Sequence, residues 1–278
     1  MLPQSEIPIC ARMELLQMGV NMAKMQEMEE ANRRVVCWFS AGDASAVAAK
    51  LAVDKYPHAI LVYIDTGSEH EDNPRFIKDV EEWLDRPVYR IKSEIYSDIW
   101  QVFHATRWLV GPAGARCTTE LKKKVRQKFE QPGDLQVFGY TIEEEERLSR
   151  FVKNNPEMNV WCPLIDKKLS KSDCHDIVSL AGIELPVMYK QGFRNNNCLG
   201  CPKGGQKYWG RIRKFYPEIF DRMSKVERKL DVAINKSYAG DGERKKVFLD
   251  ELPDDLAITE PEPSISCGLF CGQYLDET

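Results

Sequence analysis

Apolar runs alternate with helical patterns along residues 35–141, in the order typical of an α/β protein. Runs rich in β-branched and aromatic residues predict buried strands at VVCWFS (35–40), AILVYIDTGSE (59–69), PVYRIK (87–92) and LQVFGYT (135–141). Helical patterns lie between them, in the alanine-rich segment after residue 42 and over 74–85 and 118–130. This alternation predicts a mostly parallel, doubly wound sheet with helices on both faces.

The segments before and after this α/β region show helical and linker patterns instead of strands. Helical spacing of Met and Leu predicts a helix over 11–34, and Ser170 is a plausible N-cap for a helix that ends at Gly182. A second helical region covers 206–235, after which a polar, Pro-rich stretch predicts a loose linker. We therefore expect an N-terminal helix (1–32), an α/β domain (33–160), a helical region (161–235) and a flexible linker with a Cys-containing tail (236–278).

Composition narrows the class of protein. The net charge of −4 argues against a general nucleic-acid-binding surface. No apolar run reaches the length of a membrane span, and the first residues lack a signal-peptide pattern, so we expect a cytoplasmic protein without membrane contact. In that reducing compartment the nine cysteines are not expected to form a disulfide framework.

Three polar turns follow predicted strands, at 40–45, 65–70 and 139–147. Ligands of parallel sheets bind beyond the carboxyl ends of the strands, so these turns are candidates for one binding site. A strand, a turn with small residues and a helix can cradle an anion. Asp43 opposes this by adding negative charge, unless it faces solvent or holds a cation. The candidate nucleotide-binding residues in the turns are Ser40, Ala41, Gly42, Asp43, Ser45, Asp65, Thr66, Gly67 and Gly139.

Cationic side chains could complete such a site. Arg147 and Arg150 follow the third turn on one helical turn, and guanidinium groups suit phosphate or sulfate. The competing interpretation is that both arginines pair with acidic neighbours on an exposed helix. Lys122, in the Lys-rich helix, is a further candidate for phosphate or sulfate.

The segment NNNCLGCPKGG (195–205) contains a C-x-x-C pair in a polar, glycine-rich loop. The spacing lets the thiolates of Cys198 and Cys201 converge on zinc, pair as a disulfide, or join Cys117 on an iron–sulfur cluster. Scattered histidines argue against zinc. Cys267 and Cys271 could supply a fourth ligand, a nucleophile or a redox pair. Cys10, Cys37 and Cys174 are expected to be packing residues.

Together, the turn at Ser40, the IDTG strand end, GYTIEEEERLSR, Arg116-Cys117 and NNNCLGCPKGGQKYW resemble the phosphoadenosine phosphosulfate (PAPS) reductase family, of the adenine nucleotide α-hydrolase-like superfamily. The resemblance covers about residues 33–235. Iron–sulfur members place a Cys-Cys pair about eighty residues before C-x-x-C, as Cys117 stands before Cys198. Two departures are plain: SAGDAS replaces the usual SGGxDS, and Thr118 replaces the second cysteine of the pair. The tail, Ser-Cys-Gly-Leu-Phe-Cys, lacks the Glu and His of the family's E-C-G-L-H.

The resemblance implies a 4Fe–4S cluster on Cys117, Cys198 and Cys201, with Cys271 or Cys267 as fourth ligand or with one iron left open. It also implies reduction of PAPS or adenylyl sulfate, with Cys267 (or Cys271) as catalytic thiol and a thioredoxin-like reductant. The alternative is an ATP-dependent sulfurtransferase acting on tRNA or DNA, with KKLSK (167–171) and RIRK (211–214) touching nucleic acid. A third is a non-catalytic nucleotide- or nucleic-acid-binding protein. A homo-oligomer is compatible with each.

Overall fold

The computed structural model describes residues 32–111, 114–238, 244–254 and 256, and these fold as two compact units. Unit 1 contains the described residues up to Tyr63, together with Asp79–Tyr89 and Phe129–Ile183. Unit 2 contains Ile64–Lys78, Arg90–Lys128 and the described residues from Glu184 onward. The units are interleaved in sequence, because the chain passes from one to the other within β2, α4 and β3.

A five-stranded, all-parallel sheet confirms the predicted α/β class. Its order is β3-β2-β1-β6-β7, and its strands are β1 (Val35–Phe39), β2 (Ile60–Asp65), β3 (Val88–Lys92), β6 (Leu135–Val137) and β7 (Asn159–Trp161). In the centre, Cys37 is in register with Leu61 on one side and Val137 on the other. The chain therefore extends from β1 in one direction to β2 and β3 and then in the other to β6 and β7. The order reverses between β1 and β6, the point at which parallel sheets bind ligands.

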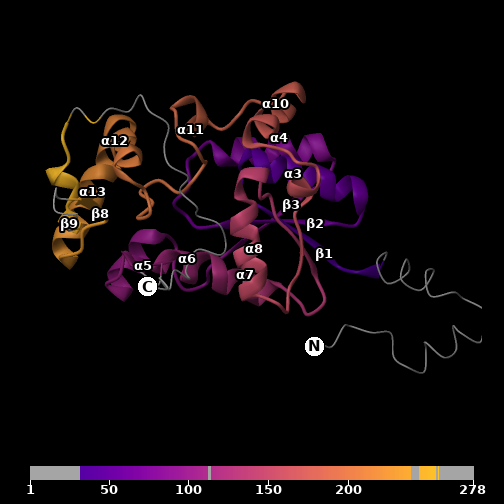
Figure 1. The fold of residues 1–278 in the computed structure, drawn as a ribbon, viewed down its shortest axis with the longest axis horizontal. Coiled ribbons are helices and arrows are strands. Elements are labelled where there is room, and N and C mark those ends of the chain that lie inside the picture. Colours follow the sequence, from indigo (N-terminus) through magenta and orange to yellow (C-terminus); the bar gives the residue numbers. More distant parts are fainter. Residues whose placement is uncertain (1–31, 112–113, 239–243, 255, 257–278) are drawn as a thin grey trace, which may run out of the picture. The chain divides into compact units, whose positions relative to one another are not determined.

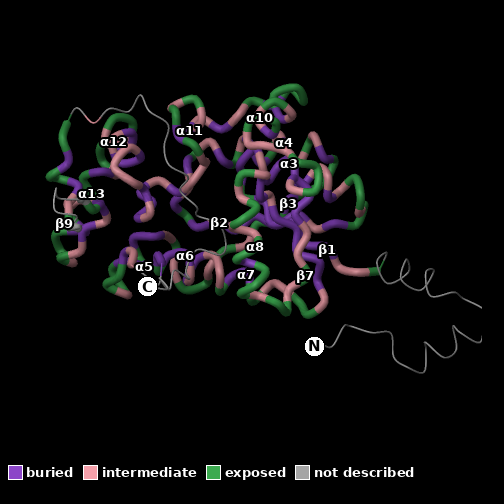
Figure 2. Tube along the Cα trace, viewed as in Figure 1, coloured by how far each residue is buried: buried purple, intermediate pink, exposed green. Residues whose placement is uncertain are grey.

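Strand β1 is buried along its whole length, as its apolar sequence predicts (Figure 2). Its one polar ring atom, Trp38 Nε1, donates to Gln136 Oε1 on the neighbouring strand at 2.5 Å. The Cys37 thiol is fully enclosed, and burial raises its pKa to about 12. Cys37 is thus an inert packing residue, as expected.

Besides its strands, unit 1 contains several helices. They are α3 (Asp43–Lys55), the 3₁₀ turn η2 (Ile142–Glu144), α8 (Glu145–Asn154), α9 (Pro163–Asp166) and α10 (Lys171–Leu180). Helix α4 (Asn73–Leu84) spans the change from unit 2 to unit 1. Helix α3 packs against β1 and β6 and also contacts α9 and α10 (Figure 1). Unit 1 therefore includes residues on both sides of the expected boundary at 160.

Helix α10 begins where the sequence predicts. Ser170 Oγ accepts a hydrogen bond from the Asp173 N–H at 3.1 Å, and the Asp173 carboxylate accepts the Ser170 N–H at 2.7 Å. This reciprocal cap satisfies two backbone donors that the first turn cannot pair internally. The chain leaves the helix through Gly182, whose φ of 77° is in the left-handed region.

Unit 2 is mainly helical. Its helices are α5 (Ile99–Thr106), α6 (Arg116–Thr118), the π-helix η1 (Thr119–Lys123), α7 (Lys124–Phe129), α11 (Val187–Lys190), α12 (Gln206–Phe215), α13 (Pro217–Leu230) and the 3₁₀ turn η3 (Leu249–Glu251). Two small antiparallel sheets pair β4 (Val110–Gly111) with β5 (Gly114–Ala115), and β8 (Asn235–Tyr238) with β9 (Arg244–Val247).

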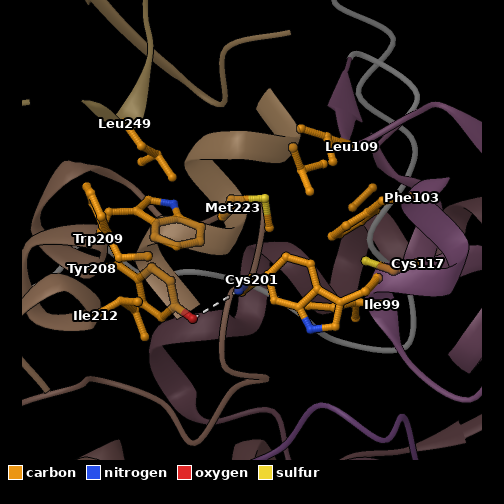
Figure 3. Packing of buried hydrophobic residues seen from close by; sticks show 14 of the residues in the cluster. Ile99, Phe103, Leu109, Cys117, Cys201, Tyr208, Trp209, Ile212, Met223 and Leu249 are labelled. Carbon is orange, nitrogen blue, oxygen red and sulfur yellow. Dashed lines mark hydrogen bonds between the residues drawn. The ribbon is translucent and has the colours of Figure 1, made fainter. Parts of the chain in front are cut away.

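An apolar cluster fills the described part of unit 2 (Figure 3). It joins residues of α5, α12 and α13, among them Phe103, Trp209 and Met223, and it also contains the two thiol residues Cys117 and Cys201. Trp209 and Met223 are completely enclosed. Unit 2 therefore has a hydrophobic core of its own.

Two parts of unit 2 differ from the sequence expectation. The predicted helical region 206–235 is two helices, because the proline at 217 cannot continue the ladder of α12. Within the expected linker (236–278), residues 236–238 lie instead in β8, Arg244–Val247 form β9 and Leu249–Glu251 form η3. The buried carboxylate of Glu227 contacts the backbone on either side of these strands, where it accepts the N–H groups of Ile234 and Leu249. Among the described residues, no helix has both the length and the apolar character needed to cross a membrane.

Candidate functional site

Hydrogen bonds to the hydroxyl group of Ser45 hold the turn after β1. Its Oγ accepts the N–H of Ser40 at 3.1 Å and that of Gly42 at 3.3 Å, and it donates to the Gly42 carbonyl at 2.8 Å. Ala41, at the apex, has a φ of 56°, a left-handed conformation that costs an L-residue about 1–2 kcal/mol. The turn SAGDAS is therefore a compact, strained loop at the start of α3.

Gly139, after β6, lies against this loop. A Cβ atom at Gly139 would be 2.9 Å from the Ala44 carbonyl oxygen and from the Ser45 nitrogen. Only glycine lets the end of β6 approach the first turn of α3 so closely. Unit 1 thus brings together Ser40, Ala41, Gly42, Asp43, Ser45 and Gly139 at the point where the strand order reverses.

Asp43 does not face solvent, as one alternative had it, but is fully buried in unit 1. Its Oδ1 accepts the Ala44 N–H at 2.7 Å and pairs with the Lys171 ammonium, while its Oδ2 lies 2.9 Å from His175 Nε2. Burial raises the pKa of Asp43, but the hydrogen bond to His175 and the charge of Lys171 outweigh it and lower the pKa to about 2. The carboxylate is therefore ionised and enclosed by cationic and donor groups.

Sequence reasoning missed Lys171 and His175 as partners of Asp43, because it singled out Lys171 only within the basic stretch 167–171. The available signal was their i, i+4 spacing, which puts both side chains on one face of α10. Between them, Cys174 is completely enclosed, and burial, with the nearby charge of Asp43, raises its thiol pKa to about 12. Cys174 is thus a packing residue, as expected.

The two arginines of the third turn have different surroundings. Arg147 pairs with Glu144 on the preceding turn, and its guanidinium carbon lies 4.8 Å from the centre of the Tyr140 ring. Arg150 is exposed on α8. The pairing of Arg147 is the local i,i+3 interaction that competes with a phosphate contact. A role of either arginine at a phosphate stays a prediction.

The turn after β2 belongs to unit 2 and has its own internal bonds. Asp65 Oδ1 accepts the Gly67 N–H at 2.8 Å, and Gly67 has a φ of 65°. The Glu69 carboxylate accepts the Thr66 N–H, with its two oxygens 3.1 and 3.2 Å from the nitrogen, and the Thr66 hydroxyl at 2.6 Å. The backbone N–H of Thr66, a candidate nucleotide-binding residue, is thus used by Glu69.

The same turn contacts the C-x-x-C loop. Thr66 Oγ1 lies 3.1 Å from Cys198 Sγ, and that sulfur lies 3.8 Å from Glu69 Oε1. In addition, the Leu199 N–H donates to the Ser68 carbonyl at 2.7 Å. Unit 2 therefore brings Thr66 and Cys198 together, although they belong to separate sequence motifs.

The buried hydroxyl group of Tyr208 forms hydrogen bonds to the backbone of the C-x-x-C loop. Tyr208 Oη accepts the N–H groups of Gly200 and Cys201, each at 3.0 Å, and donates to the Cys198 carbonyl at 2.8 Å. The dashed line in Figure 3 marks one of these bonds. Both cysteines are almost fully buried. The conformation of the loop is thus fixed by protein groups.

Cys117 lies immediately before a π-helical turn. α-Helix α6 widens into η1 directly after Thr118, and such turns often occur at functional sites. The half-buried Lys122 is on this turn. The buried carboxylate of Glu120 pairs with Arg116 at 2.8 Å and with Lys124 at 2.6 Å, which neutralises part of the basic charge beside Cys117.

The thiol chemistry suits a soft metal centre, since Cys117, Cys198 and Cys201 are buried donors in one unit. Within the described part of the chain, however, no three His, Cys, Asp or Glu side chains gather around one point as a metal site would require. The expected fourth ligand Cys271 and the expected catalytic thiol Cys267 lie outside the described residues, as does Cys10.

Comparison with known proteins gives relatives without assigned function. No family model matches the chain. It is 24% identical over 197 residues to the uncharacterized protein MJ0973 of Methanocaldococcus jannaschii, covering 68% of this chain and 46% of that protein. It is 25% identical over 232 residues to the uncharacterized protein MJ0066 of the same organism, covering 78% of this chain and 46% of the relative. The chain thus spans about half the length of these relatives.

Proposed function

We propose that the chain is a sulfonucleotide reductase of the PAPS reductase type, with the adenine nucleotide α-hydrolase-like fold. The observation that carries this proposal is the contact between Thr66, directly after β2, and Cys198 of the C-x-x-C pair, with 3.1 Å between oxygen and sulfur. It joins a strand-end turn of the type that binds nucleotides to a buried thiol. The sheet reversal at the Ser40–Ser45 turn supports nucleotide binding independently.

In this proposal unit 1 binds the phosphates of PAPS or adenylyl sulfate. The turn Ser40–Ser45 approaches them with its backbone, and Gly139 lets the end of β6 lie close against this turn. Arg147 and Arg150 are the candidate cations of unit 1. Asp65, Thr66, Gly67 and Lys122 belong to unit 2 and remain candidate nucleotide contacts on the sequence resemblance alone. Cys117, Cys198 and Cys201, with Cys271, would hold a 4Fe–4S cluster. That group would tune the charge near the substrate rather than carry electrons.

The proposed reaction is one displacement at the sulfate sulfur, followed by two thiol-exchange steps. The Cys267 thiolate attacks the sulfate sulfur, an S–S bond forms, and the S–O bond to phosphate breaks, so the nucleotide leaves with the electron pair. A thioredoxin-like dithiol then attacks the Cys267 sulfur and releases sulfite. Its second thiol resolves the mixed disulfide, regenerating Cys267 and leaving the reductant oxidised.

The test is anaerobic purification with iron and sulfide analysis, followed by sulfite release from PAPS and from adenylyl sulfate with thioredoxin and dithiothreitol. We expect about four irons per chain, lost in Cys198→Ser and retained in Cys10→Ser. Sulfite release should disappear in Cys267→Ser and persist in Cys10→Ser. Undiminished sulfite release by Cys267→Ser would refute the mechanism. Conversion of ATP to AMP with a tRNA or DNA acceptor, without sulfite, would establish the sulfurtransferase alternative instead.

A further inference from the structure

The buried carboxylate of Asp43 is a problem for an anion-binding turn. Asp43 is the first residue of α3, and its Oδ1 accepts the N–H of Ala44 in that same helical turn. An ionised carboxylate there would repel a phosphate and would occupy a donor that could otherwise bind it. SAGDAS, read in isolation, therefore disfavours the function proposed above.

Helix α10 supplies the compensation. Lys171 pairs with Oδ1 of Asp43, and His175 Nε2 lies 2.9 Å from Oδ2, so each carboxylate oxygen has a partner from this helix. About a quarter of each partner side chain is exposed, 23% for Lys171 and 29% for His175, whereas the Asp43 side chain is fully covered. The negative charge is thus enclosed, and the positive charge of Lys171 lies nearer to solvent.

We propose that Lys171 and His175 are positioning residues of the phosphate-binding turn, which hold and neutralise Asp43 so that the start of α3 accepts an anion. The proposal rests on the proposed function, since it concerns the same nucleotide site. In this proposal α10 affects substrate binding through Asp43. Neither Lys171 nor His175 contacts the nucleotide. The substrate class that benefits is any adenine nucleotide with a 5′-phosphate.

Neutralisation differs from direct contact in one measurable respect. If Lys171 only cancels the charge of Asp43, removing both charges restores the balance, and Asp43→Asn/Lys171→Gln binds phosphate as the wild type does. If Lys171 touches the phosphate, the double variant remains weak, because the cation is missing whatever residue 43 is. Neither mechanism affects adenosine, which has no phosphate.

The experiment is calorimetric titration of AMP and of adenosine into the wild type, Lys171→Gln, Asp43→Asn/Lys171→Gln and the matched control Lys153→Gln. Lys153 is exposed in the same unit, so its substitution makes the same change in net charge. We expect Lys171→Gln to bind AMP about tenfold more weakly. The double variant should return to within about threefold of the wild type. Adenosine affinity should be constant throughout, and Lys153→Gln should behave as the wild type.

The remaining outcomes are each decisive. A double variant still tenfold weaker than the wild type overturns the positioning role while leaving the proposed function intact. An unchanged AMP affinity in Lys171→Gln does the same. A wild type that binds neither ligand refutes the proposed nucleotide site and the inference with it. If Lys171→Gln fails to fold by circular dichroism, the comparison of the double variant with the wild type decides alone, because no buried charge is left without a partner in that variant.

Discussion

The hydroxyl oxygen of Thr66 lies 3.1 Å from the sulfur of Cys198, across a sequence separation of 132 residues. The same hydroxyl donates to Glu69 at 2.6 Å, so one side chain joins a carboxylate, a strand end and a thiol. Thr66 is therefore central to the structure of this part of unit 2, whichever ligand the thiols hold.

Replacing Thr66 by valine should lower the free energy of unfolding by about 1–2 kcal/mol. Valine has nearly the same shape but no hydroxyl, so the buried hydrogen bond to Glu69 and the contact to Cys198 are both lost. Urea denaturation measures the change, and Thr66→Ser, which keeps the hydroxyl, is the control. Equal stabilities of the Val and Ser variants would mean that the hydroxyl contributes nothing.

Replacing Ala41 by glycine should stabilise the protein by about 0.5–1 kcal/mol. The φ of 56° strains alanine but not glycine, and this relief exceeds the extra entropy that glycine loses on folding. Ala44→Gly is the opposite control, because Ala44 is helical in α3 and glycine should destabilise it by about 0.5–1 kcal/mol. Thermal denaturation should show shifts of opposite sign, and a loss of stability in both variants would contradict the strain at Ala41.

Replacing Gly67 by alanine should destabilise the protein by about 3 kcal/mol. The new Cβ atom would lie 1.9 Å from the Ser97 carbonyl oxygen, and the left-handed φ of 65° adds strain. Gly182→Ala separates these two causes, since Gly182 has a similar φ of 77° and no atom within 4 Å of the added Cβ. Chemical denaturation should show a loss of only about 1 kcal/mol for Gly182→Ala, and similar losses at both sites would rule out the clash with Ser97.

Glu227 should make stability fall as the pH rises. Burial raises its pKa from 4.5 to about 7, although the N–H groups of Ile234 and Leu249 favour the charged form. A raised folded-state pKa contributes stability that is complete below about pH 4.5 and is lost as the pH rises through about 7. Between pH 5 and pH 8 the free energy of unfolding of the wild type should fall by up to about 3 kcal/mol relative to that of Glu227→Gln.

Urea titrations of the wild type and Glu227→Gln at both pH values measure this difference. Glu251→Gln is the control in the same segment, because hydrogen bonding to Arg228 lowers the pKa of that carboxyl and gives no decline in this range. A pH-independent difference between the wild type and Glu227→Gln would show that Glu227 ionises equally in the folded and unfolded states.

Local signals predicted much of unit 1. The apolar runs at 35–40, 59–69, 87–92 and 135–141 are β1, β2, β3 and β6, and Ser170 caps α10 as its sequence indicates. The short strand β7 was missed because Asn159–Trp161 has too few residues to show alternation. The pair of strands β8 and β9 is polar, and Glu227 of α13 accepts the N–H groups of Ile234, just before β8, and of Leu249, two residues after β9.

The candidate site was harder to predict, because its contacts join distant segments. Asp43 and Lys171 are 128 residues apart, and neither residue type alone indicates the other. The spacing of Cys198 and Cys201 was evident, but the phenol that holds their loop was not, since tyrosine seven residues after a C-x-x-C pair is an ordinary helix residue. Sequence motifs thus identified candidate residues, but only the three-dimensional structure shows which of them are in contact.

The single oxygen of Tyr208 holds three backbone groups of the C-x-x-C loop, and the ring belongs to the core of unit 2. Small zinc modules, by contrast, acquire their fold only when the ion binds. In this chain three hydrogen bonds to one protein oxygen hold the loop, in addition to anything that the thiols bind. If the thiols hold the proposed cluster, the fold of this loop would therefore not depend on the cluster alone.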